Sequence, residues 1–244
     1  MRSDSKIILA LAIPAVLQTL VRSSFIIIDA YWVGKLGSIQ LAALTVATFL
    51  VWGAMALGEM VSTGANSLIA QSTGAQNKEL SKEIATVNIV NTFFHSLILG
   101  LLMIPLLPLL YHIINLNPEQ SQLANSYLVP FLSGLPCVTL LATVTAIFRG
   151  YGDTKTPFYL LLFALGVNLV ITPLLIFGIT GIPGLGIQGA AYAALISYLI
   201  AAIIGYVILK KRKFKKTLTM KKASIYSANT FHITSSLLFR LRIC

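Results

Sequence analysis

Charged side chains are scarce in this chain. They make up 10% of its 244 residues, against 57% hydrophobic residues, and the mean hydropathy is +0.85. A soluble domain carries about 25% charged and 45–50% apolar residues, and so few charges could not cover the water-exposed surface of a protein this large. The scarcity argues against a soluble globular domain and predicts that lipid is the solvent.

Acidic residues and cysteines are rarer still. The chain has seven Asp and Glu against 18 Lys and Arg, and two cysteines. Two cysteines are too few for a disulfide framework or a metal cage. The net charge of +11 would fit a nucleic-acid ligand, but more than half of the basic residues lie from Lys210 onward and the rest form short clusters between apolar runs. We interpret this charge as a membrane-topology signal and expect no nucleic-acid partner.

Apolar runs recur six times, each long enough to cross a bilayer, which takes roughly 20 mostly apolar residues. They predict helices over residues 7–33, 41–71, 84–114, 123–148, 158–178 and 188–209. Membrane bundles tolerate prolines inside such helices where neighbours satisfy the freed carbonyls. The predicted fold class is an all-α membrane protein, with six transmembrane helices in a domain of residues 1–209.

The Lys and Arg residues predict the orientation, because cytoplasmic loops are rich in them. All but two lie before the first helix, in the loops after the second and fourth helices, or after the sixth. The exceptions are Arg22, within the first helix, and Lys35, on the opposite side. We expect a multi-pass protein of the cell membrane with both termini in the cytoplasm. Residues 210–244 are predicted to form a basic cytoplasmic tail with no further span.

Asp29 is one of the few ionisable residues at membrane depth, where each is a hypothesis for function. It lies roughly 6 Å below the outer end of the first predicted helix, at 1.5 Å per residue. Partial removal from water favours the neutral form of a carboxylic acid, and a proton-coupled carrier needs a group that can change its charge. The alternative is an interfacial Asp among the outer headgroups, beside Tyr31 and Trp32.

Arg22 is a second ionisable residue within the first predicted helix. Arg22 lies two turns below Asp29 on nearly the same face. Unpaired charges in a bilayer are costly, so we predict an ion pair of Arg22 with Glu59 or Asp29, either structural or part of a site.

Asn168 and Thr172 are one turn apart and share a face of the fifth predicted helix. Thr172 lies about 9 Å from the outer end of that helix, a depth comparable to that of Asp29. These residues could line one cavity with Asp29 and bind the coupling cation. The alternative is that Asn168 bonds across helices, as polar residues in membrane bundles commonly do.

Enzyme motifs are missing from the sequence. Residues 184–189 match G-x-G-x-x-G, but a dinucleotide site needs a preceding strand and an acid about 20 residues later. A membrane helix precedes this segment and no acid follows Asp153, so we interpret it as a glycine-rich turn. The sequence contains no His-x-x-x-His pair, Gly-x-Ser-x-Gly elbow or P-loop. We therefore expect neither an enzyme nor an ATP-driven pump, and no metal site.

The loop between the fourth and fifth predicted helices reads Phe-Arg-Gly-Tyr-Gly-Asp-Thr-Lys-Thr-Pro over residues 148–157. It closely resembles the signature of the multidrug and toxic compound extrusion (MATE) family. Asp29 with residues 33–37, and residues 70–77, 168–178 and 186–191, are similar to other parts of that family in the same order. The resemblance covers about residues 5–212. The loop residues that carry it are Arg149, Gly150, Gly152, Asp153, Thr154 and Pro157.

The resemblance implies secondary active export of drugs and organic cations, driven by inward H⁺ or Na⁺ and without a cofactor. Members of the family have twelve helices in two lobes around a central cavity, an arrangement suited to alternating access. The family's first-helix acid falls on Asp29 and its fifth-helix Asn on Asn168. Where many members carry a further acid, this chain has Thr172, which leaves the coupling ion open.

The chain has the length of one such lobe, and nothing after about residue 216 resembles the family. We expect the N-terminal lobe, with the tail a truncation or frameshift product. Its partners would be the lipid bilayer, organic cations, and a second lobe or a second copy. One alternative is an inactive membrane-inserted fragment. Another is a lipid-linked sugar flippase of the wider superfamily, but the loop signature argues against the flippase.

Overall fold

The computed structural model describes residues 2–179 and 182–213, and nearly all of them are helical. The elements are α1 (Arg2–Gly34), α2 (Ser38–Gly74), α3 (Lys78–Met103), η1 (Ile104–Leu106), α4 (Leu107–Ile113), α5 (Pro118–Ser133), α6 (Leu135–Gly150), α7 (Lys155–Phe177), β1 (Gly178–Ile179), β2 (Ile182–Pro183) and α8 (Ile187–Lys213). Most of the predicted 210–244 tail lies outside the described residues. Residues 210–213 form the end of α8.

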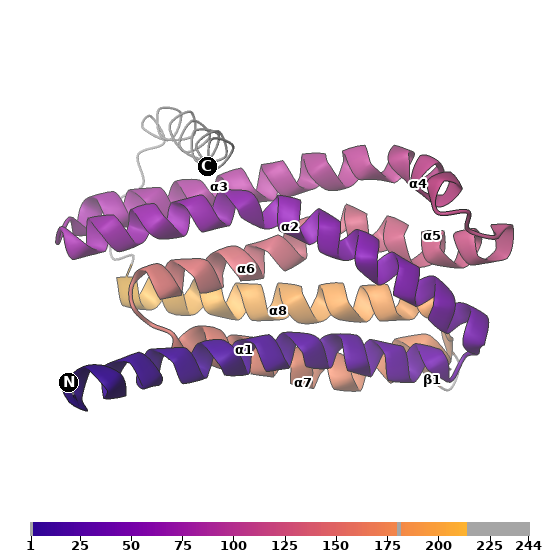
Figure 1. Ribbon diagram of the computed structural model, residues 1–244, viewed down its shortest axis with the longest axis horizontal. Coiled ribbons are helices and arrows are strands. Elements are labelled where there is room, and N and C mark those ends of the chain that lie inside the picture. Colours follow the sequence, from indigo (N-terminus) through magenta and orange to yellow (C-terminus); the bar gives the residue numbers. More distant parts are fainter. Residues whose placement is uncertain (1, 180–181, 214–244) are drawn as a thin grey trace.

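The long helices run alongside one another in one elongated bundle (Figure 1). α2 and α3 lie along one side, α1 and α7 along the other, and α6 and α8 run between them. Five described helical segments are long and apolar enough to cross a membrane, and α5 with α6 makes a sixth. The predicted class of a six-span α-helical lobe is confirmed. α1 begins and α8 ends at the same end of the bundle, as an even number of crossings requires.

The helix predicted over residues 123–148 is two helices, α5 and α6, bent by 52°. The bend lies at Gly134, and Pro136 follows at the start of α6. Proline has no N–H to donate to the carbonyl four residues earlier and its ring crowds that carbonyl. The helix predicted over 84–114 is likewise interrupted by η1, which contains Pro105. The bend at Gly134 thus divides its span into two helices, whereas Lys78–Ile113 still forms one candidate span.

A hydroxyl cluster joins three helices in the middle of the bundle. The Ser62 hydroxyl of α2 lies 2.6 Å from that of Thr143 on α6 and 3.3 Å from that of Thr92 on α3. All three side chains are buried. Apolar burial drives little association in lipid, so interhelical hydrogen bonds and close packing hold such bundles together.

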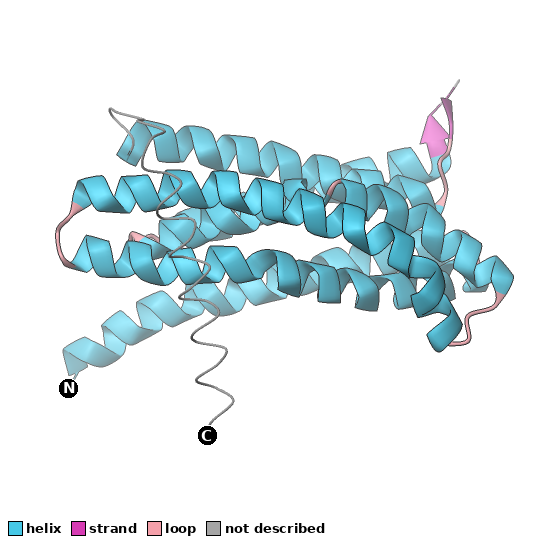
Figure 2. Cartoon of the chain, turned by 90° about the horizontal axis from the view of Figure 1, so that it is seen from above, coloured by secondary structure: helices cyan, strands magenta, loops and turns pink. Residues whose placement is uncertain are grey.

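The glycine-rich segment predicted to be a turn does connect α7 and α8. The two short strands pair antiparallel at one end of the bundle, with Gly178 opposite Pro183 (Figure 2). Gly186 has φ +57°, and a Cβ on Gly189 would collide with the Leu175 backbone. The glycines therefore allow a left-handed turn and close packing of α8 on α7. The small strand pair was not predicted.

Candidate functional site

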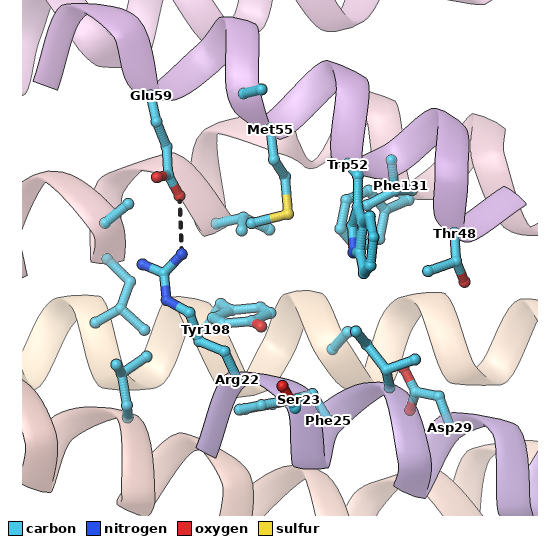
Figure 3. A pocket seen from close by; sticks show the side chains of 18 of the residues that line it. Arg22, Ser23, Phe25, Asp29, Thr48, Trp52, Met55, Glu59, Phe131 and Tyr198 are labelled. Atoms are coloured by element: carbon cyan, nitrogen blue, oxygen red, sulfur yellow. Dashed lines mark hydrogen bonds and ion pairs between the residues drawn. The ribbon is translucent and has the colours of Figure 1, made fainter. Parts of the chain in front are cut away.

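A cavity of about 360 Å³ lies between α1 and α2, and residues of α5, α6, α7 and α8 complete its lining (Figure 3). Figure 3 shows its polar groups at its two ends and its large aromatic side chains between them. The residues used below are Arg22, Phe25, Asp29, Thr48, Trp52, Met55, Glu59, Tyr127, Phe131 and Tyr198.

Asp29 lies at one end of this cavity, near Thr48 of α2 (Figure 3). Its residue is 8% exposed, and its Oδ1 atom has no hydrogen-bond partner among the described residues. Buried carboxyl oxygens are normally paired, since desolvation without a partner is costly. An unpaired carboxyl that lines a cavity is therefore available to a ligand or an ion.

Arg22 and Glu59 meet at the other end of the cavity (Figure 3). Arg22 Nη1 lies 3.4 Å from Glu59 Oε1, so that α1 and α2 are joined by an ion pair. The two side chains are 40% and 29% exposed, so the pair faces the cavity and is not sealed inside packed helices. Of the two partners that the sequence left open for Arg22, the structure pairs it with Glu59.

An aromatic wall lies between the two polar ends. Phe25 of α1 stacks on Tyr198 of α8 with ring centroids 5.0 Å apart, and Tyr127 stacks on Phe131 within α5 at 5.8 Å. Trp52 of α2 faces the same space (Figure 3). The sequence analysis missed these residues, because an aromatic residue on an apolar helix has the same pattern whether it faces a cavity or lipid.

Asn168 and Thr172 are fully buried on α7, and neither lines the cavity. The amide atoms of Asn168 and the hydroxyl of Thr172 have no hydrogen-bond partner among the described residues. α7 packs beside α1, and Phe177 at its end contacts Trp32 with ring centroids 6.1 Å apart. Asn168 and Thr172 are thus buried polar residues on α7, the helix beside α1, and they do not line the cavity that contains Asp29.

The α6–α7 loop that carried the resemblance is held together by short-range contacts. Gly152 has φ +78°, which favours glycine. Asp153 Oδ1 accepts from the backbone N–H groups of Lys155 and Thr156 at the start of α7. An acid at a helix N-terminus satisfies donors that have no intrahelical acceptor.

Gln18 connects the same loop to α1. Its amide nitrogen donates to the Thr154 carbonyl over 3.2 Å, and its amide oxygen accepts from Arg149 Nη1 over 3.4 Å. Gly150 packs against Ile69 of α2, and Pro157 is buried in the first turns of α7. Gln18 had no signal in the sequence, since its partners are more than 130 positions away.

The residues that the structure describes contain no group of three or more His, Cys, Asp or Glu side chains placed to hold a metal ion.

Comparison with known proteins agrees with the six-helix arrangement. The MatE family model matches residues 14–174. The chain is 29% identical over 215 residues to the probable multidrug resistance protein NorM of Thermotoga maritima, covering 86% of this chain and 46% of that protein. It is 28% identical over 211 residues to the FAD transporter of Shewanella oneidensis, covering 85% of this chain and 46% of that protein.

A solved structure has the same fold over almost the whole chain. The Vibrio cholerae MATE transporter VcmN in the bent form superposes with a TM-score of 0.84 at 20% identity, covering 96% of this chain and 53% of that one. The chain spans about half the length of the relatives that it matches. It belongs to the MatE family and corresponds to the N-terminal lobe of a MATE transporter.

Proposed function

We propose that this chain is one half of a secondary antiporter that exports drugs or other organic cations across the cell membrane in exchange for H⁺ or Na⁺. The cavity of α1 and α2 is the observation that carries the proposal. Its volume of about 360 Å³ suits a small molecule. Aromatic ring faces attract organic cations, most strongly where water is excluded.

The charges of the cavity support a cationic substrate over an anionic one. Its lining contains two carboxylates, Asp29 and Glu59, and one guanidinium, Arg22. The relatives include both multidrug resistance proteins and an FAD transporter, and FAD carries anionic phosphates. A lipid-linked sugar also carries anionic phosphates, so a lining with two acidic residues and one basic residue favours neither that flippase function nor FAD transport.

In this proposal Asp29 exchanges the coupling ion. It is the cavity carboxylate without an ion-pair partner among the described residues, and it lies on α1, which packs beside α7. A proton needs only the carboxyl group. A sodium ion needs several oxygen ligands. Thr48 lies near Asp29 in the cavity, whereas Asn168 and Thr172 are buried on α7 outside the cavity lining.

The proposal requires a second lobe. Alternating access moves one structural repeat against another around a site between them, and this chain spans about half of its relatives' length. A lobe alone would also leave cavity charges facing lipid, which costs on the order of a few kcal/mol per charged group. We expect a second lobe or a second copy to complete the transporter, and an inserted but inactive fragment where neither is present.

Efflux of ethidium, a fluorescent organic cation, tests this function. The chain is expressed in bacterial cells that lack other exporters, alone and together with the C-terminal half of the Thermotoga maritima relative, and membrane levels are compared by blot. We expect background efflux from the chain alone and efflux that depends on an H⁺ or Na⁺ gradient from the pair. Gradient-dependent efflux by the chain alone, running as a homodimer in detergent, would show a half-size transporter instead. No efflux in either case, with both halves inserted, would support the inactive fragment.

A further inference from the structure

The ion pair of Arg22 and Glu59 lies at the end of the cavity away from Asp29 (Figure 3). We infer that Glu59 binds the positively charged group of the substrate, and that Arg22 is a built-in competitor that the substrate must displace. This inference rests on the proposed function, since it concerns the same cavity. It makes Arg22 and Glu59 determinants of substrate affinity rather than a permanent brace between α1 and α2.

The geometry of the pair is that of an exchangeable contact. The one atom pair within range is Arg22 Nη1 and Glu59 Oε1, at 3.4 Å. Strong charge-assisted hydrogen bonds are about 2.7–2.9 Å long, and arginine often binds a carboxylate through two such bonds. Both side chains are partly exposed, which weakens an ion pair further. Another cation can therefore replace Arg22 at Glu59.

A second positive charge weakens the hold of Glu59 on Arg22. The charge of Arg149, at the end of α6, interacts with those of both Arg22 and Glu59. Arg149 Nη1 also donates to the Gln18 side chain of α1 over 3.4 Å. Like charges repel, so Arg149 disfavours the pairing of Arg22 with Glu59 and competes with it for the same acid.

An aromatic cation at Glu59 would make contacts that Arg22 does not make. Met55 and Trp52 are about one and two turns from Glu59 along α2, and Tyr198 lies beside Arg22 (Figure 3). A planar ring system that occupies this space adds apolar contact and ring stacking to its attraction for Glu59. The cavity therefore favours cations attached to an aromatic body over small hydrophilic ones.

Ethidium binding to the purified full-length chain in detergent, followed by fluorescence anisotropy, tests the inference. The variants are Arg22→Gln, Glu59→Gln and the two together, and thermal melting checks that each is folded. Lys35→Gln is the matched control. It removes one positive charge from the segment that ends α1, where Lys35 lies over the rings of Tyr31 and Trp32 and does not line the cavity.

Arg22→Gln should bind ethidium about two- to fivefold more tightly than the unchanged chain, the range expected for removal of a partly exposed ion pair. Glu59→Gln should bind more weakly, the double variant should resemble Glu59→Gln, and Lys35→Gln should match the unchanged chain. Equal binding by all variants, or weaker binding by Arg22→Gln, would overturn the inference while the proposed function stands. If neither the unchanged chain nor Arg22→Gln binds ethidium, the inference and the proposed cation site fail together.

Discussion

Replacing Asp29 with Asn tests whether the Asp29 carboxyl group serves transport or stabilises the fold. The amide is nearly isosteric, and Asp29 Oδ1 has no hydrogen-bond partner among the described residues, so the replacement breaks no bond at that atom. A charged Asp at the centre of a membrane helix costs about 2.5–3.5 kcal/mol. Asp29 lies five residues before the end of α1, about 7.5 Å along the axis, so we expect a cost of about 1 kcal/mol or less.

Removal of that cost should leave the Tm of the purified chain unchanged or raise it by up to about 2–4 °C, the shift that 1 kcal/mol produces in a protein of this size. Gradient-driven ethidium efflux by the chain with its second lobe should fall to background, because an amide cannot cycle between neutral and charged forms. Thermal melting and efflux are measured on the same Asp29→Asn variant. Thr48→Val, a change at the same end of the cavity, is the matched control in both assays. A large fall in Tm would show that Asp29 supports the fold, and persistent efflux with unchanged pH dependence would remove it from coupling.

Three further predictions concern stability and topology. Arg22→Ala should lower the amount of folded protein, and a second change at Glu59 should recover part of it. Because the pair is partly exposed, we expect a coupling energy near 1 kcal/mol in thermal melts, less than the several kcal/mol expected for a buried pair. Strictly additive losses of stability would count against the pairing. Thr143→Val should lower the free energy of unfolding by about 0.6–1.7 kcal/mol. Ser62→Ala should lower it much less in the Thr143→Val background than in the unchanged chain, and equal losses in both backgrounds would argue against the hydroxyl cluster. In a cysteine-free chain, a cysteine introduced at Gly152 should resist impermeant thiol reagents in intact cells, and its labelling would reverse the predicted orientation.

The number and class of the helices follow from the sequence, because the length of an apolar run is a local property that the bilayer thickness converts into a span. The breaks are harder to predict. The consequence of Pro136 depends on whether neighbouring helices keep the span straight, and here α5 and α6 bend by 52°. The effect of Pro105 is also context-dependent, since Pro130 and Pro173 lie inside helices that remain continuous.

The candidate site was only partly predictable. Asp29 and the Arg22 pair were found because charges are rare at membrane depth and each demands an explanation. The aromatic residues Trp52 and Tyr198 were missed, since lipid and cavity both accept them. Thr172 and Asp29 were expected to lie at a similar depth. Helical spacing predicts the depth of a residue and the face of its own helix, but not which neighbouring helix that face contacts.

The cavity between α1 and α2 is proposed to bind organic cations, and a cysteine in its lining tests this most directly. In a chain whose native cysteines are replaced, Met55→Cys places a thiol on the cavity lining between Trp52 and Glu59. The rate of its modification by a small cationic thiol reagent is measured with and without ethidium. We predict that the thiol reacts and that ethidium slows the reaction several-fold, whereas a cysteine at Phe94, which is exposed on α3 and does not line the cavity, gains no protection. Equal rates with and without ethidium at Met55→Cys would contradict the central claim.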